Sequence, residues 1–181
     1  MINKNDFKAY LKEHMKFIEK YPKEVWCKIF ELEEEFKDYF WTQHASACSS
    51  GSTWLLLALK AIGVTQGDEV LVNCNYFISD PNSILFSWAK PVFIDLWDSI
   101  NSLSLKEIER NITENTKAII IIHMYGYPIE NSHAIVTLCK KYKIKVIEDC
   151  CQAIWAKIGT QYVWTLWDIG IFSFDTNKLV K

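Results

Sequence analysis

Apolar residues recur along this chain at two different spacings. In the segment CKIFELEEEFKDYF, residues 27–40, they return every three or four positions, which predicts an amphipathic helix. Beyond it, short continuous apolar runs alternate with helix-like segments. The runs predict strands at 45–48, 69–72, 91–95, 117–122, 145–148 and 169–174, and the segments between them predict helices at 52–62, 79–88, 104–111 and 129–142.

The predicted strands are apolar throughout rather than at every second residue, and AIIII at 118–122 is the longest such run. Continuous apolar strands that alternate with helices are typical of a parallel sheet covered by helices on both faces. We therefore expect an α/β fold with three layers, α/β/α, and a mostly parallel sheet. Ligands of such sheets bind beyond the carboxyl ends of the strands.

The overall composition is that of an ordinary globular protein. Half of the residues are hydrophobic and the formal net charge is −2, so nothing indicates disorder, a nucleic-acid partner or an anionic membrane. The longest apolar run is too short to cross a bilayer, and the N-terminus lacks the apolar stretch of a secretory signal. We expect a cytoplasmic protein with no membrane partner.

Cysteine and histidine positions give no metal-site pattern. The six cysteines lack the paired spacing of zinc ligands and the four histidines are scattered, so we predict no metal. The adjacent Cys150 and Cys151 leave two readings open, redox chemistry or small buried residues after a strand.

A first candidate site is SSGST, residues 49–53, at the predicted start of a helix. Small residues let backbone N–H groups approach an anion, and the helix N-terminus supplies partial positive charge. The hydroxyls of Ser52 and Thr53 add donors. The segment is a candidate phosphate site, although an ordinary helix cap has the same residues.

Two further candidates follow predicted strands. Asp149 ends VIED, where a carboxylate could pair with a protonated ring nitrogen, or bind a metal, or cap the strand. Lys178 ends FSFDTNK, where an amine could hold an aldehyde cofactor as an imine, or remain solvated. Phe77 could stack on a planar ring or belong to the core. His123 is expected to be a hydrogen-bonded structural histidine.

Seven segments in a common order resemble the DegT/DnrJ/StrS family of sugar aminotransferases, which are fold-type I enzymes dependent on pyridoxal 5′-phosphate (PLP). They run from about Trp26 to Lys178. The segments are ELEEEF, SSGS, GDEVLV, AKPVFID, TKAIIIIHMYG, VIEDCCQA and DIGIFSFDTNK. Each is weak alone, and their shared order is the specific signal.

This resemblance implies roles for individual residues. Lys178 matches the catalytic lysine that binds the PLP aldehyde, Asp149 the acid at the pyridine nitrogen, and Phe77 the stacking aromatic. Gln152 matches the polar residue near the ring hydroxyl. The remaining cofactor-binding residues that the resemblance implies are Gly51, Ser52, Thr53 and Ser173.

The implied reaction moves an amino group from an amino acid, typically glutamate, to a nucleotide-linked keto-sugar, with Lys178 shuttling a proton. One alternative is a truncated, non-catalytic relative that keeps the fold. Another is a related PLP-dependent sugar dehydratase, but those enzymes carry histidine where Lys178 stands. An unrelated Rossmann-like nucleotide binder is not supported, because the chain has no GxGxxG motif.

Relatives in this family continue well beyond the lysine. The resemblance therefore implies an N-terminal fragment, with a helical segment at 1–24 and part of the PLP-binding large domain at 25–181. The small C-terminal domain would be absent, and the whole protein would be a homodimer.

Tryptophan is unusually frequent and glycine unusually rare. The chain has eight tryptophans and six glycines, about half of the ordinary ~7% glycine. The family typically has glycine at six of the tryptophan positions, which are Trp26, Trp41, Trp88, Trp155, Trp164 and Trp167. Our hypothesis is that all eight tryptophans, including Trp54 and Trp97, come from UGA codons that the source organism reads as glycine. The alternative is a genuinely tryptophan-rich, divergent homologue. In that case we expect strain at Trp155 and Trp164.

Overall fold

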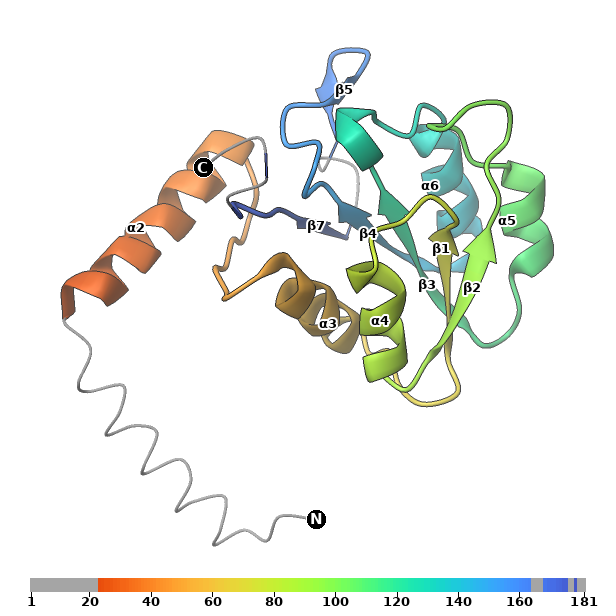
Figure 1. Cartoon of the computed structure of the whole chain (residues 1–181), viewed down its shortest axis with the longest axis horizontal. Helices are drawn as coiled ribbons and strands as arrows, with labels where there is room; N and C mark the ends of the chain where they lie inside the picture. Colours follow the sequence, from red (N-terminus) through yellow and green to blue (C-terminus); the bar gives the residue numbers. More distant parts are fainter. Residues whose placement is uncertain (1–22, 164–167, 176–177, 179–181) are drawn as a thin grey trace, which may run out of the picture. The chain divides into compact units, whose positions relative to one another are not determined.

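The computed structural model describes residues 23–163, 168–175 and 178, with side chains placed from Cys27 onwards. The chain divides into two compact units, residues 1–47 and residues 48–181. Their described elements are labelled in Figure 1. The helical segment predicted at 1–24 lies outside the described residues except for its last two positions.

The first unit contains helix α2 (Lys23–Phe40), which includes the predicted helix and begins four residues earlier. Its ring pair Phe36 and Phe40 has centroids 4.2 Å apart. The strand predicted at 45–48 is wrong, because these residues pair with no other strand. Instead, the N–H of Ala47 donates to a carboxylate oxygen of Glu33 at 2.7 Å. A run of this length can form few backbone hydrogen bonds to a neighbouring strand, so its apolar pattern is weak evidence for a strand.

The second unit is built around a five-stranded parallel sheet. In sheet order its strands are β2 (Lys90–Ile94), β1 (Glu69–Asn73), β3 (Thr116–Ile122), β4 (Lys145–Asp149) and β7 (Ile169–Ile171). Its helices are α3 (Gly51–Ala61), α4 (Ser79–Phe86), α5 (Leu105–Asn111) and α6 (Ser132–Tyr142), with a short 3₁₀ turn η1 (Met124–Gly126) after β3. A hairpin of β5 (Lys157–Ile158) and β6 (Gln161–Tyr162) was not predicted.

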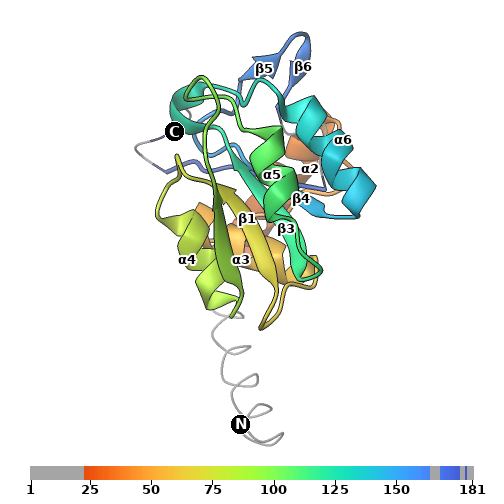
Figure 2. The same cartoon turned by 90° about the vertical axis from the view of Figure 1, so that its right-hand side faces the viewer.

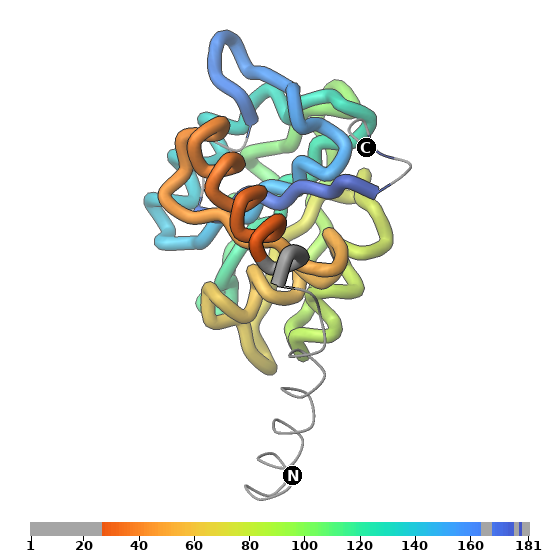
Figure 3. The backbone as a smooth tube through the Cα atoms, turned by 90° about the vertical axis from the view of Figure 1, so that its left-hand side faces the viewer, coloured from red at the N-terminus to blue at the C-terminus, as the bar shows by residue number. Residues whose placement is uncertain are grey.

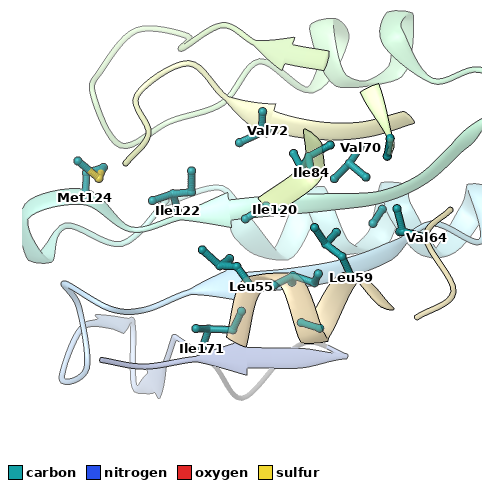
Figure 4. Packing of buried hydrophobic residues seen from close by; sticks show 14 residues of the cluster. Leu55, Leu59, Val64, Val70, Val72, Ile84, Ile120, Ile122, Met124 and Ile171 are labelled. Carbon is teal, nitrogen blue, oxygen red and sulfur yellow. The ribbon is translucent and has the colours of Figure 1, made fainter. Parts of the chain in front are cut away.

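Helices cover both faces of this sheet, with α3 and α4 on one and α5 and α6 on the other (Figures 1 and 2). Alternate residues of β3 serve the two sides. Ile120 belongs to the core cluster that contains Leu59 of α3, as Figure 4 shows. Ile119 belongs to the cluster that contains Ile135 of α6. The predicted three-layer α/β/α fold with a mostly parallel sheet is confirmed.

The last described strand brings the chain back to the sheet. In Figure 3 the β5–β6 hairpin and β7 are the blue segments. Strand β7 pairs with β4, with Ile169 opposite Ile147. The strand predicted at 169–174 ends at Ile171, so residues 172–175 leave the sheet at the edge where β4 also ends. Among the described helices, none is long and apolar enough to cross a membrane.

Two tryptophans occupy backbone conformations that favour glycine. Trp41 has φ 51° and Trp88 has φ 64°, both in the left-handed region. Their side chains are 91% and 75% exposed, so burial of the indole offsets little of that strain. Both positions support the glycine hypothesis. Trp155 is not among the residues with positive φ, so the strain expected there is not found. Trp164 and Trp167 lie outside the described residues.

Replacing Trp88 by glycine is expected to raise the free energy of unfolding by about 1 kcal/mol, because glycine adopts positive φ without a Cβ penalty. Urea denaturation of the two proteins measures the difference. The matched control is Trp97→Gly, since Trp97 is 68% exposed and is not among the residues with positive φ. A gain of equal size in the control would show that backbone strain is not the cause.

Candidate functional site

A pocket of about 150 Å³ lies in the second unit, where the carboxyl ends of β3, β4 and β7 meet the N-terminus of α3. It is lined by Ser50, Gly51, Ser52, Leu55, Phe77, Ser79, Ile122, His123, Met124, Asp149, Cys151, Gln152, Ser173, Asp175 and Lys178. Every predicted site residue except Thr53 therefore lies on one pocket. Parallel strands explain this convergence, because their carboxyl ends share one edge of the sheet.

The first turn of α3 forms one wall. Ser50 is the N-cap, and its hydroxyl oxygen accepts from the N–H of Thr53 at 3.2 Å. The Thr53 hydroxyl lies 3.0 Å from that of Ser50, which explains why Thr53 does not line the pocket. The hydroxyls of Ser52 and Ser79 are 2.7 Å apart. The N-termini of α3 and α4 thus present hydroxyl groups to the same space.

Gly51 is required by the close approach of two segments. A Cβ at this position would lie 3.1 Å from the sulfur of Cys151 and 3.5 Å from the Cβ of Ser173. The loop after β4 and the segment after β7 thus pack directly against the first turn of α3. This packing leaves the backbone of that turn accessible to a bound group, as an anion site requires.

Lys178 and Asp149 both face this pocket. The Lys178 Nζ lies 5.1 Å from the centre of the Phe77 ring, which is within range for a cation–π interaction. Asp149 is almost fully buried, and its Oδ1 accepts from the N–H of Cys151 at 2.8 Å. Burial and then the negative charge of Asp149 raise the pKa of the Cys151 thiol, while Lys178 acts on it in the opposite direction. The Cys151 thiol is therefore close enough to both Asp149 and Lys178 for their charges to affect its pKa.

Adjacent acids of β4 point to opposite faces of the sheet. Ile147 packs in the core under α3, and Val146 packs in the core under α6. Because side chains alternate along a strand, Asp149 lies on the α3 side with the pocket and Glu148 lies on the α6 side. The sequence VIED had left open which of its two acids faces a ligand.

Glu148 is paired with a buried histidine. The Ile129 N–H donates to His123 Nδ1 at 2.9 Å, so Nε2 carries the proton and donates to Glu148 Oε1 at 2.7 Å. Burial lowers the pKa of His123 to about 3 and raises that of Glu148. The sequence-based expectation of a hydrogen-bonded histidine is confirmed. The bond from the Ile129 N–H to His123 also keeps residue 129 out of α6, which was predicted from 129 and begins at Ser132.

Ligand atoms of His123, Glu148 and Cys150 lie within 4.8 Å of one another, a grouping that a metal ion could use. Both ring nitrogens of His123 are already engaged in hydrogen bonds, which accounts for the cluster without a metal. Burial raises the pKa values of the Cys150 and Cys151 thiols. Because the thiolate is the reactive form, these cysteines fit the reading of small buried residues better than redox chemistry.

Gln152 and Ser173 both line the pocket. The Tyr125 N–H donates to Gln152 Oε1 at 2.9 Å, which fixes the amide at the pocket wall. Ser173 accepts from the N–H of Asp175 at 3.4 Å. Sequence reasoning missed Ser79 and the fully buried Asp80 behind it. The sequence signal that could have identified them is their position shortly after Phe77, beyond the carboxyl end of β1.

Comparison with known proteins extends this picture. A profile of the DegT/DnrJ/EryC1/StrS aminotransferase family matches residues 12–180. The chain is 39% identical over 152 residues to a GDP-perosamine synthase of Escherichia coli O157:H7, covering 84% of this chain and 42% of that protein. It is 42% identical over 147 residues to a UDP-N-acetyl-3-dehydro-alpha-D-glucosamine 3-aminotransferase of Acidithiobacillus ferrooxidans, covering 81% and 40%.

Among solved structures, NtdA from Bacillus subtilis with bound cofactor PMP matches with a TM-score of 0.77 and 27% identity, over 98% of this chain and 40% of that one. The chain therefore spans about 40% of the length of each of these relatives.

Proposed function

Since the chain belongs to the DegT/DnrJ/EryC1/StrS aminotransferase family, we propose that the whole protein transfers an amino group from an amino acid to a nucleotide-linked keto-sugar, with PLP as cofactor. Glutamate is the donor we propose. The acceptor class is supported by the two relatives above, whose names contain a GDP-linked and a UDP-linked sugar. The proposal includes a homodimer, with residues 25–181 as part of its cofactor-binding domain.

The single observation that carries the proposal is the pocket itself. Lys178, Asp149 and Phe77, which come from three separate segments, line one space with the first turn of α3. These groups suit an aromatic aldehyde that bears a phosphate and a ring nitrogen. The N–H groups of a helix N-terminus suit the phosphate, and a side chain at position 51 would press against Cys151 and Ser173 in the same wall.

When bound, the cofactor supplies an electron sink and carries the amino group between the two substrates. Three residues that line the pocket would then have separate roles. The Lys178 amine would be the group that holds the aldehyde, and it would be placed to move the proton at the substrate Cα. The Asp149 carboxylate would hold the protonated ring nitrogen of the cofactor, and Phe77 would supply an aromatic face for its ring. Burial of Asp149 excludes the water that would otherwise screen its charge.

Addition of PLP to the purified chain tests this function. We expect a new absorbance band and, after borohydride reduction, PLP attached to the peptide that contains Lys178. The whole protein is then assayed with glutamate and nucleotide-linked keto-sugars. A pocket that takes up no PLP would contradict the cofactor assignment and would favour a non-catalytic relative. PLP uptake without amino transfer by the whole protein would contradict the reaction.

Replacing Gly51 by valine is expected to weaken PLP binding by about tenfold or more, because the added side chain would occupy the space between α3 and Ser173. Fluorescence titration with PLP measures the affinity. Ser49→Val is the matched control, since Ser49 is exposed in the same turn and does not line the pocket. Equal losses in the two variants would show that the effect does not come from the pocket wall.

A further inference from the structure

Asp80 is a fully buried acid that the proposed function does not use. It lies in the first turn of α4, and its Oδ2 accepts from the N–H of Phe77 at 3.1 Å. Its other carboxyl oxygen, Oδ1, is buried and meets no hydrogen-bond donor among the described residues. A buried carboxylate oxygen without a donor is costly, so this position calls for an explanation.

The explanation lies in its neighbour. Asp149 is close enough for its charge and its side chain to raise the pKa of Asp80. Two ionised carboxylates can only accept hydrogen bonds, so the pair needs one proton between them. Asp149 already accepts from the Cys151 N–H at 2.8 Å and lines the pocket, where the positive Lys178 also lies. Asp80 is the more buried member and does not line the pocket.

We propose that Asp80 is a neutral carboxylic acid that donates its proton in a hydrogen bond to Asp149 and so positions the Asp149 carboxylate at the pocket. Burial and, second, the charge of Asp149 raise the pKa of Asp80 to about 9, which agrees with a proton held at neutral pH. Asp80 is a positioning residue, because it would act on the cofactor only through Asp149. The effect of Asp80 on the cofactor rests on the proposed function. The protonation of Asp80 does not, because it concerns the chain without cofactor.

The other titratable groups around the pair are few. Cys151 follows Asp149, and its thiol pKa is raised by burial and by the charges of Asp149 and Asp80. Lys178 opposes that shift from the far side of the pocket. The thiol therefore stays neutral and adds no charge beside the two acids. Two hydrogen bonds, from the Cys151 N–H and from Asp80, would then fix the orientation of its carboxylate.

The test for the proton uses the chain without cofactor. Infrared difference spectra between protein labelled with ¹³C-aspartate and unlabelled protein, in which the bands of Glu148 cancel, should show a protonated aspartate band at neutral pH. Asp80→Asn should remove this band, and Asp98→Asn, a change at an exposed acid, should keep it. A spectrum without the band, or one in which Asp80→Asn leaves it unchanged, would overturn the proposal.

Stability gives a second reading with a defined sign. In the unfolded chain Asp80 loses its proton near its ordinary pKa, so a folded state that retains the proton becomes less stable as pH rises from about 4 to about 9. Asparagine has no such titration and can still donate to Asp149. The Tm of Asp80→Asn relative to that of wild type should therefore rise by about 10 °C between about pH 5 and about pH 8.5. A constant difference contradicts the proposal.

The positioning role is tested separately with PLP. Asp80→Leu, which has a similar shape and no donor, should weaken PLP binding about tenfold, and Asp80→Asn should restore it to within about twofold of wild type. Equal affinities for the leucine and asparagine variants would refute the positioning role. If no variant or wild type binds PLP, the proposed function fails, and the infrared band still decides whether Asp80 carries the proton.

Discussion

Replacing Lys178 by arginine is expected to reduce borohydride-dependent attachment of PLP to background. Arginine keeps a positive charge near the Phe77 ring, where the Lys178 Nζ lies 5.1 Å from the ring centre. However, a guanidinium stays protonated at all accessible pH values and is not an amine nucleophile, so it cannot form a bond with the aldehyde. Mass spectrometry of peptides after PLP treatment and reduction measures the loss. Because arginine resembles lysine in charge and length, a loss of labelling in this variant reports the loss of the amine nucleophile.

The control for this experiment is Lys106→Arg. Lys106 is exposed on α5, which covers the sheet face opposite to the pocket, so this variant should be labelled as efficiently as wild type. PLP is a reactive aldehyde that also modifies surface lysines. If PLP labels several lysines equally, or if the arginine variant is still labelled at the wild-type level, then Lys178 has no special role.

Removing the buried imidazole of His123 is expected to cost about 3 kcal/mol of unfolding free energy. In His123→Ala, the buried Glu148 loses the donor at 2.7 Å, and the Ile129 N–H loses its acceptor at 2.9 Å. Urea denaturation measures the loss. His133→Ala, at an exposed position on α6, is the matched control and should change stability by less than about 0.5 kcal/mol. A loss below about 1 kcal/mol in His123→Ala would show that these bonds contribute little.

The same variant should change the response to acid. The folded His123 has its pKa lowered to about 3, against an ordinary value of 6.5, so below about pH 6.5 the unfolded chain binds a proton that the folded chain does not. Stability conferred by the neutral imidazole is therefore lost as pH falls from about 6.5 towards about 3. His123→Ala should flatten this part of the stability curve, whereas His133→Ala should leave it in place. An unchanged acid slope in His123→Ala would assign the slope to other groups.

Most of the fold could be predicted because buried parallel strands are continuous apolar runs. The β3 run, for example, was predicted to within one residue. The errors occurred where local pattern and tertiary contact disagree. Residues 45–48 look like a strand but have no partner strand, and β5 and β6 have two residues each, which is too short for any periodic signal. The late start of α6 comes from tertiary contacts of the residues before it, such as those of Ile129 with His123 and of Asn131 with Leu103.

The candidate site could be predicted where residues directly follow strands. The sequence alone indicates Asp149, Lys178 and Phe77, because the ends of parallel strands share an edge. Asp80 was missed for a physical reason. An acid in the first turn of a helix usually serves as an exposed partner of the helix dipole, and only the folded chain shows that this one is buried beside Asp149.

The alternation of β4 has a consequence for insertions and deletions. Asp149 and Glu148 are adjacent in the sequence, yet Asp149 lines the pocket and Glu148 is hydrogen-bonded to His123. Inserting one residue ahead of Val146 would rotate each acid to the other side of the sheet and would exchange their surroundings. The register of β4 against β3, with Ile147 opposite Ile120, therefore decides which of the two acids reaches the pocket.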